Sequence, residues 1–125
     1  MKLLLDTHIY LWWLATPAMM ADEARTAIAN PRNHVFVSSV SIIEIAIKQA
    51  NGKLKTEEAP ENMLESCRFH EMPLTVAHAA ALRNLPPIHK DTFDRLLAAQ
   101  ALTEGLTLIT RDPVLRQYAV PFIAA

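Results

Sequence analysis

The sequence predicts an α/β fold in which a central, mostly parallel sheet is flanked by helices to form a three-layer sandwich. Three short apolar runs predict buried strands, namely Leu3–Leu5, Val35–Val37 and Leu106–Ile109. Segments with helical periodicity lie between them, and this alternation is typical of a parallel sheet that is covered on both faces. The 125 residues, 51% of them hydrophobic, contain no repeat and no linker, so we expect a single domain over residues 1–125.

The helix signals of the first half begin directly after the first strand. We expect one helix after Asp6 and a second over Asp22–Asn30. Ser41 and Glu44 form a capping-box pattern that predicts the start of a third helix, which Gly52 ends. This half of the chain therefore has the strand-helix-strand order that a parallel sheet requires.

The second half predicts more helices and two short strands. The predicted helices are Glu61–Arg68, Val76–Asn84 and Thr92–Glu104. Thr75 caps the second of these, and Gly105 ends the last one directly before the strand at Leu106. Weaker strand signals lie near Phe69–Met72 and Val120–Ile123, and the direction of the last strand stays open.

Composition limits the classes of function. A formal net charge of -1 does not provide the basic surface that a strong, sequence-independent grip on nucleic acid needs. Cys67 is the only cysteine, which excludes an internal disulfide and a Cys-rich zinc site and favours a reducing compartment, so we expect a cytoplasmic protein. Lys2 and the apolar residues after it resemble a signal peptide, but Asp6 and His8 interrupt the apolar centre, and we expect no membrane association.

Two acidic residues follow predicted strands. Asp6 comes directly after the first strand, and Asp112 follows the strand Leu106–Ile109 across a short turn. The carboxyl edge of an open parallel sheet is where ligands bind, so both side chains are candidate site residues. The alternative for each is that it only caps the helix that follows, which for Asp112 would begin at Pro113.

Three further acids lie at predicted helix starts. Glu44 falls in the first turn of the helix after Val35–Val37 and can reach the same sheet edge, or it can simply complete the capping box. Asp91 and Asp94 are three residues apart at the start of another helix. Asp91 suits the N-cap position, which leaves Asp94 as the better candidate ligand.

Four acids, Asp6, Glu44, Asp94 and Asp112, thus come from the beginnings of different elements that a parallel sheet would place side by side. Clustered carboxylates repel one another unless a cation joins them. Oxygen ligands without a thiolate favour Mg²⁺, with Mn²⁺ as the alternative, over zinc.

The histidines have no spacing that predicts convergence on a shared site, and we expect surface or core-edge positions for His8, His34, His70, His78 and His89. The assignment of His89 stays open, because it directly precedes Lys90 and Asp91. Trp12 and Trp13 indicate core or interface packing, because no basic residue is interleaved with them as in a base-stacking platform. The basic residues expected nearest to phosphate, each with a solvated ion pair as its alternative, are Lys48, Lys90, Arg95, Arg111 and Arg116.

Four segments taken in order resemble a known family: Leu4–His8 with Leu11-Trp12, Ser38–Glu44 with Gly52–Leu54, His89–Arg95, and Leu108–Asp112. Over nearly the whole chain the sequence resembles the PIN-domain ribonucleases, and more narrowly the VapC-type toxins of bacterial type II toxin-antitoxin pairs. The resemblance implies that the metal-binding acids are Asp6, Glu44, Asp94 and Asp112, with Asp91 and Thr110 in supporting positions. Thr92 departs from the pattern, which often has proline there.

The resemblance further implies a Mg²⁺-dependent endoribonuclease in which the carboxylates hold metal and a metal-activated water hydrolyses an RNA phosphodiester bond. It also implies a homodimer and a cognate antitoxin that occupies or distorts the acidic site. The near-neutral charge leads us to expect a narrow, structured RNA target.

Three alternatives remain. A phospho-accepting signalling module would have further acids beside the first strand and a lysine after the late strand, where Asp6-Thr7-His8 and Thr110-Arg111-Asp112 stand instead. A phosphatase with an aspartate nucleophile would have a second carboxylate at the position of His8. A catalytically inactive PIN-like binding protein is disfavoured by the presence of all four acids.

Overall fold

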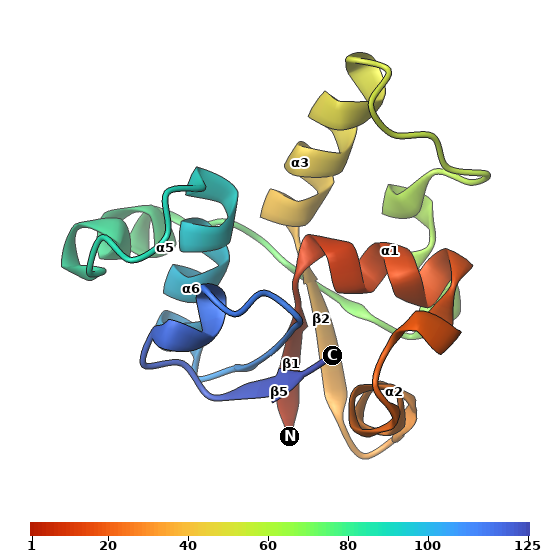
Figure 1. Ribbon diagram of the computed structural model, residues 1–125, viewed down its shortest axis with the longest axis horizontal. Helices are drawn as coiled ribbons and strands as arrows, with labels where there is room; N and C mark the ends of the chain where they lie inside the picture. The colour runs from red at the N-terminus through yellow and green to blue at the C-terminus, as the bar shows by residue number, and fades with distance from the viewer.

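The central sheet of the computed structural model, which describes residues 1–125, has five strands in the order β3-β2-β1-β4-β5 (Figure 1). The strands are β1 (Lys2–Leu5), β2 (His34–Ser38), β3 (His70–Met72), β4 (Thr107–Thr110) and β5 (Phe122–Ala124). Every pair of neighbouring strands is parallel, including β4 and β5. The predicted mostly parallel sheet is therefore confirmed, and the direction of the last strand, which the sequence left open, is parallel as well.

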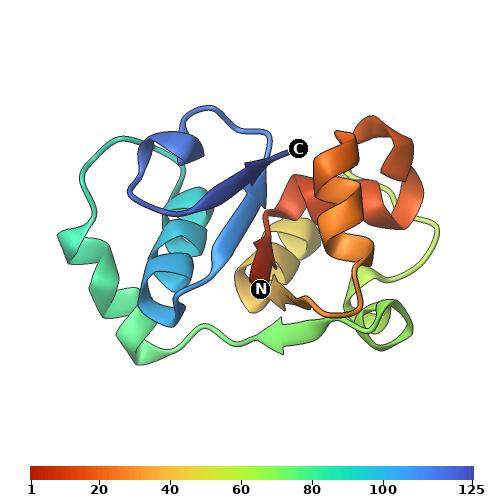
Figure 2. The ribbon, with the colours of Figure 1, turned by 90° about the horizontal axis from the view of Figure 1, so that it is seen from below.

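The helices cover both faces of the sheet. They are α1 (Thr7–Ala15), α2 (Asp22–Ala29), α3 (Ser39–Ala50), α4 (Leu64–Cys67), α5 (Val76–Ala81) and α6 (Thr92–Glu104). Short 3-10 turns occur at Pro17–Met19, Pro60–Asn62, Leu82–Asn84 and Leu115–Gln117. Figure 2 shows the sheet between α5 and α6 on one side and α1 and α2 on the other.

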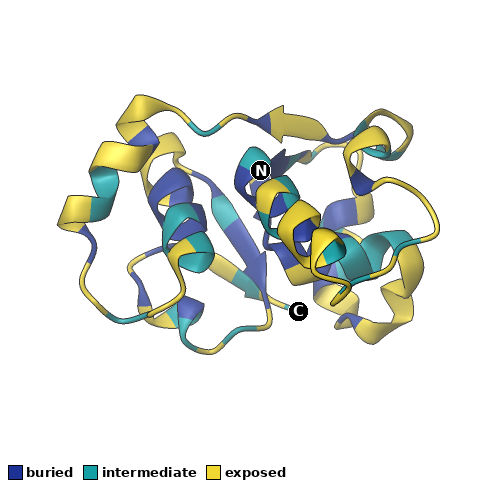
Figure 3. Cartoon of the chain, turned by 90° about the horizontal axis from the view of Figure 1, so that it is seen from above, coloured by how far each residue is buried: buried dark blue, intermediate teal, exposed yellow.

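The two layers of core follow from the alternation of side chains along the strands. Leu3 and Leu5 of β1 pack into the cluster formed with α1 and α2, whereas Leu4 packs into the cluster formed with α6. Figure 3 shows the central strands largely buried and the edge strand β3 largely exposed. No helix of this fold is both long and apolar enough to cross a membrane.

The start of α3 differs from the prediction. The helix begins at Ser39, and the Ser38 hydroxyl oxygen caps it by accepting a hydrogen bond of 2.9 Å from the Val40 N–H. Ser41 is buried inside the helix, where its Oγ accepts a hydrogen bond of 2.9 Å from the Thr7 hydroxyl. The predicted capping box was wrong because strand β2 passes directly into the helix, and Glu44 therefore lies beyond the first turn, free of a capping role.

Other helix limits were predicted correctly. Thr75 caps α5, Asp91 caps α6, and Gly105 ends α6 in the left-handed conformation at φ 68°. Three predicted helices are shorter than expected. One of them is α5, which ends at Ala81 and is followed by the 3-10 turn Leu82–Asn84. The region 61–68 divides into a 3-10 turn and α4, and the expected helix after Pro113 is only the 3-10 turn Leu115–Gln117.

A buried polar contact joins the two halves of the site-bearing edge. The Ser38 hydroxyl, at the start of α3, donates a hydrogen bond of 2.5 Å to Oε1 of Gln100 in α6. Both side chains have no exposed surface. Because buried polar groups need partners, this bond fixes the beginning of α3 against the middle of α6.

Candidate metal centre

The acids predicted as site residues lie around one hollow of about 290 Å³ at the carboxyl edge of the sheet. Its wall is formed by Asp6, Thr7, His8, Leu11, Glu44, Lys48, Asp91, Asp94, Arg111 and Asp112. The parallel strands bring these residues together because β1, β2 and β4 all end on the same side, as the sequence pattern predicted.

Asp6 is held from two sides. Its Oδ1 accepts a hydrogen bond of 2.9 Å from the Ile9 N–H, so it caps α1, and its Oδ2 accepts one from the Thr110 hydroxyl. The side chain therefore caps α1 and at the same time lines the hollow. Burial raises the pKa of Asp6 to about 6, and the negative charges of Asp112 and Glu44 add to the rise.

Asp94 lies in the first turn of α6, with 23% of its side chain exposed. Burial raises its pKa to about 7, and the nearby carboxylate of Asp91 contributes to the same shift. Asp91 itself accepts hydrogen bonds from the N–H groups of Phe93 and Asp94, at 2.8 and 3.2 Å, which confirms it as the N-cap. Burial is thus the main cause of the raised pKa values of Asp6 and Asp94, and the neighbouring carboxylates add to both shifts.

His89, whose assignment the sequence left open, lies between two of the acids. Its Nε2 is 2.9 Å from Oδ2 of Asp112 and 3.1 Å from Oδ2 of Asp94. Its Nδ1 accepts a hydrogen bond of 3.0 Å from the Asp91 N–H, so Nε2 carries the proton that faces both carboxylates. Burial acts to raise the pKa of Asp112, but the hydrogen bonds from His89 and the Val114 N–H outweigh it and hold that pKa below its usual value.

The other histidines separate into two groups. His8, His34 and His70 are exposed, as expected, although His8 borders the acidic hollow. His78 is only 1% exposed, so the surface or core-edge prediction was wrong for it. It completes the cap of α5 and contacts Oε1 of Glu104 through Nε2 at 2.9 Å. The capping offset of three residues from Thr75 was the sequence signal for this role.

Glu44 is 12% exposed at its side chain and pairs with Lys48, whose Nζ lies 2.7 Å from Oε2 one helical turn later. Lys48 and Arg111 are the two predicted phosphate-facing residues that border the hollow. Arg95 points elsewhere, because its guanidinium donates hydrogen bonds to the carbonyl oxygens of Pro86 and Leu82. Arg95 does not line the hollow, so its position does not support the predicted contact with phosphate.

The remaining two predicted contacts lie outside the hollow. Lys90 is exposed on the loop before α6. The guanidinium carbon of Arg116 lies 5.7 Å from the ring centroid of Phe122, on the side of β5. Of the five predicted phosphate contacts, only Lys48 and Arg111 therefore border the hollow, and they come from different elements.

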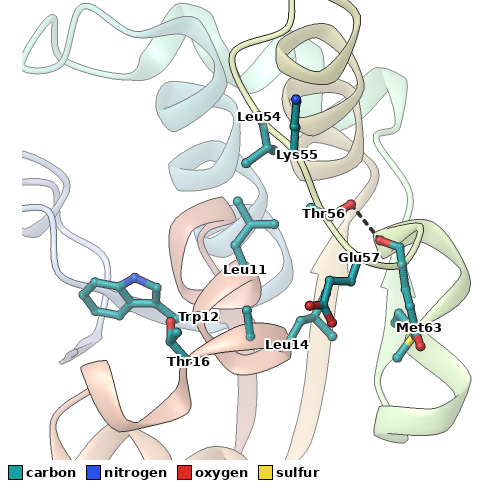
Figure 4. Close-up of a pocket in the computed structure, with 11 residues that line it drawn as sticks. Leu11, Trp12, Leu14, Thr16, Leu54, Lys55, Thr56, Glu57 and Met63 are labelled. Atoms are coloured by element: carbon teal, nitrogen blue, oxygen red, sulfur yellow. Dashed lines mark hydrogen bonds between the residues drawn. The ribbon is translucent and has the colours of Figure 1, made fainter.

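A larger groove of about 560 Å³ is shown in Figure 4. It shares the lining residue Leu11 with the acidic hollow. One wall is α1, with Leu11, Trp12 and Leu14, and the other is the segment from Leu54 to Met63. Six of its eleven lining residues are hydrophobic, and none of the four predicted metal-binding acids reaches it. The mostly apolar groove is suited to binding an apolar surface, whereas the carboxylates that could hold a metal line the smaller hollow.

The acidic hollow fits a hard divalent cation. Its donors are carboxylate oxygens from four different elements, and no thiolate is present. The ligand atoms of His89, Asp94 and Asp112 lie within 4.8 Å of one another. A dication would favour the charged forms of Asp6 and Asp94, whose pKa values burial and the neighbouring carboxylates raise to about 6 and about 7.

Known proteins share this sequence pattern and this architecture. A family model described as PIN domain matches residues 3–121. Ribonuclease VapC22 of Mycobacterium tuberculosis is 29% identical over 123 residues, which cover 94% of this chain and 92% of that relative.

Solved structures resemble the fold over the full length. A chain in the crystal structure of VapBC2 from Rickettsia felis, bound to a DNA fragment from their promoter, matches with a TM-score of 0.73 at 17% identity. That match covers 100% of this chain and 99% of the other. A chain of DNA-bound VapBC from Salmonella typhimurium has a TM-score of 0.69 at 18% identity, covering 99% and 98% of the two chains. At these identities the two structures show the fold alone.

Proposed function

The chain belongs to the PIN-domain family, and we propose that it is a Mg²⁺-dependent endoribonuclease that acts as the toxin of a toxin-antitoxin pair. The observation that supports this most directly is the convergence of Asp6, Glu44, Asp94 and Asp112 on one hollow where two carboxyl groups have raised pKa values. The relative named Ribonuclease VapC22 supports RNA as the substrate.

In this proposal the four acids hold Mg²⁺, or Mn²⁺ in its place. A cation held there would supply an activated water for attack on the phosphodiester and a positive charge near the leaving oxygen. Thr110 keeps the Asp6 carboxylate in position, and His89 does the same for Asp94 and Asp112. Lys48 and Arg111 line the rim of the hollow, where the phosphates of an RNA strand would approach.

A cognate antitoxin and a homodimer complete the proposal. The similar solved structures include a toxin-antitoxin complex from Klebsiella pneumoniae and VapBC assemblies, and the chain matches those folds over nearly its whole length. We propose that the antitoxin of this chain inhibits it by occupying or distorting the acidic hollow.

The competing signalling function is disfavoured by the residues beside Asp6 and Asp112. A phospho-accepting module would have a further acid beside the first strand and a lysine after the late strand. Asp6 is followed by Thr7 and His8 instead, and Thr110-Arg111-Asp112 stands at the end of β4.

Incubation of the purified chain with structured RNAs tests the proposal. Cleavage should require Mg²⁺ or Mn²⁺, stop with chelator, and disappear in Asp6→Asn and Asp94→Asn, while circular dichroism shows both variants folded. Unchanged cleavage in the two variants would refute the assigned site. A metal-binding chain that cleaves no RNA would instead favour an inactive PIN-like binding protein.

A further inference from the structure

A third hollow, of about 380 Å³, lies beside the acidic one and differs from it in charge. It is lined by Trp12, Met19, Arg111, Arg116, Ala124 and Ala125, so it presents two guanidinium groups and no acidic side chain. Arg111 lines both hollows. The two hollows are therefore adjacent, with Arg111 at the border between them.

The indole of Trp12 is held in a defined orientation at this position. The guanidinium carbon of Arg111 lies 4.9 Å from its ring centroid. The imidazole of His8 packs edge-on against the same indole, with centroids 4.6 Å apart and an interplanar angle of 88°. The result is a stacked cation and aromatic ring directly beside Asp112, the neighbour of Arg111 in sequence.

Neither arginine of this hollow is paired with a carboxylate. The ion pairs of the chain involve Arg25, Lys48 and two histidines, but not Arg111 or Arg116. Both guanidinium groups lie instead over aromatic rings, those of Trp12 and Phe122. Their N–H donors are thus available to an anionic ligand, and a planar guanidinium suits phosphate in particular.

We propose that this hollow, the Trp12 subsite, binds a nucleotide of single-stranded RNA next to the scissile phosphate. The base packs against the Trp12 and Arg111 stack, and a phosphate pairs with Arg116. Aromatic rings combined with arginines are the usual platform for single-stranded nucleic acid. The inference depends on the proposed ribonuclease function. It adds a local binding site for the RNA, which a chain with a net charge of -1 needs because its overall charge does not attract nucleic acid.

The Trp12 subsite changes the interpretation of the tryptophan segment. No basic residue is interleaved with Trp12 and Trp13 in the sequence, which favoured core or interface packing. The basic partner comes from the residue after β4, which the fold brings over the indole. Trp13 keeps the packing role, since its ring lies 6.0 Å from that of Phe69 within the α1 and α2 side of the core.

The neighbouring Trp13 makes a matched optical control. In an Asp94→Asn background, Trp13→Phe leaves Trp12 as the only tryptophan, and Trp12→Phe leaves Trp13. On titration with a single-stranded RNA oligonucleotide, emission should be quenched in the Trp13→Phe protein and stay constant in the Trp12→Phe protein. Equal quenching in both proteins, or none in either, would overturn the subsite.

Affinity supplies a second measurement. In the same background, Trp12→Ala and Arg111→Ala should each weaken RNA binding about 5- to 100-fold, as expected for loss of one stacked base. Arg32→Ala removes one charge from an exposed turn before β2 and serves as the control for net charge. If Arg32→Ala loses as much affinity for RNA as Arg111→Ala, the site is not local and the proposal is refuted. The proposal is also refuted if poly-glutamate, titrated in the same way, binds at Trp12 more tightly than the RNA does.

These binding measurements separate the two proposals. They use a variant without the Asp94 carboxylate, so they do not depend on hydrolysis. Quenching at Trp12 in a chain whose wild type cleaves no RNA would refute the ribonuclease and support the subsite, whereas cleavage without quenching would do the reverse. Circular dichroism of Trp12→Ala, with Trp12→Phe as the conservative variant, checks that the fold is intact.

Discussion

The Thr110 hydroxyl donates a hydrogen bond to Oδ2 of Asp6, 104 residues earlier in the chain. The same hydroxyl oxygen accepts a hydrogen bond of 2.9 Å from the Asp112 N–H. One threonine at the end of β4 thus holds the carboxylate that follows β1 and the backbone of a second predicted ligand. The contact is buried and joins the ends of β1, the central strand, and its neighbour β4.

Thr110→Val should weaken the metal site while leaving the fold intact. Valine keeps the shape of the side chain but removes the donor to Asp6, so the carboxylate loses its fixed orientation. Loss of such a supporting contact typically costs about 10- to 100-fold in metal affinity or activity. The Mg²⁺ dependence of RNA cleavage measures it, and Thr110→Ser, which keeps the hydroxyl, should stay near wild type.

Asp94→Asn should stabilise the metal-free chain at neutral pH. The pKa of Asp94 is about 7 in the folded chain against an ordinary value of 3.8, so between these pH values the folded state binds more protons than the unfolded state. Stability contributed by this group is therefore lost as the pH rises through that range. Removing the charge should raise the metal-free Tm at pH 7.5 by roughly 3–6 °C, for a gain on the order of 1 kcal/mol.

Measuring the Tm of both proteins at two pH values, with and without Mg²⁺, checks whether Asp94→Asn stabilises the chain as predicted. The advantage of Asp94→Asn over wild type should shrink at pH 5, where the wild-type carboxyl is protonated. Saturating Mg²⁺ should raise the Tm of the wild type more than that of the variant. A variant less stable than the metal-free wild type at pH 7.5 would contradict the raised pKa of Asp94.

His89→Ala should disorder the pair formed by Asp94 and Asp112. The imidazole donates toward one oxygen of each carboxylate, and without it the two side chains lose their common partner. We expect a higher Mg²⁺ requirement and RNA cleavage reduced about 10- to 100-fold. His70→Ala, an exposed histidine on β3, is the control. Equal activity of the two variants would remove His89 from the site.

Gln100→Leu should destabilise the fold. Leucine leaves the buried Ser38 hydroxyl without the acceptor that it uses now, and an unpaired buried polar group costs about 1–3 kcal/mol. Urea denaturation measures the loss in free energy of unfolding. Gln117→Leu, at an exposed glutamine, should change it little. A Gln100→Leu protein as stable as the wild type would show that the contact between α3 and α6 is not needed.

Much of the candidate site could be predicted from short stretches of sequence. An apolar run followed by Asp6, or by Thr110-Arg111-Asp112, is a local pattern, and the carboxyl ends of parallel strands meet on one side of a sheet. Asp91 was likewise identified as a cap from its neighbours alone. The start of α3 was missed because Ser38 and Ser41 are both acceptable caps, and only the end of β2 decides between them.

The sequence by itself determined the class of fold and the acids at the strand ends, because side-chain alternation, capping and strand edges depend on residues close together in the chain. Only the tertiary structure decided which residues His89, Arg111 and Trp12 contact. His89 and Asp112 are 23 residues apart, and Arg111 reaches Trp12 from the far end of the chain. Such contacts leave no periodic pattern in the sequence, because they depend on how distant segments pack around the sheet and not on neighbouring residues in the chain.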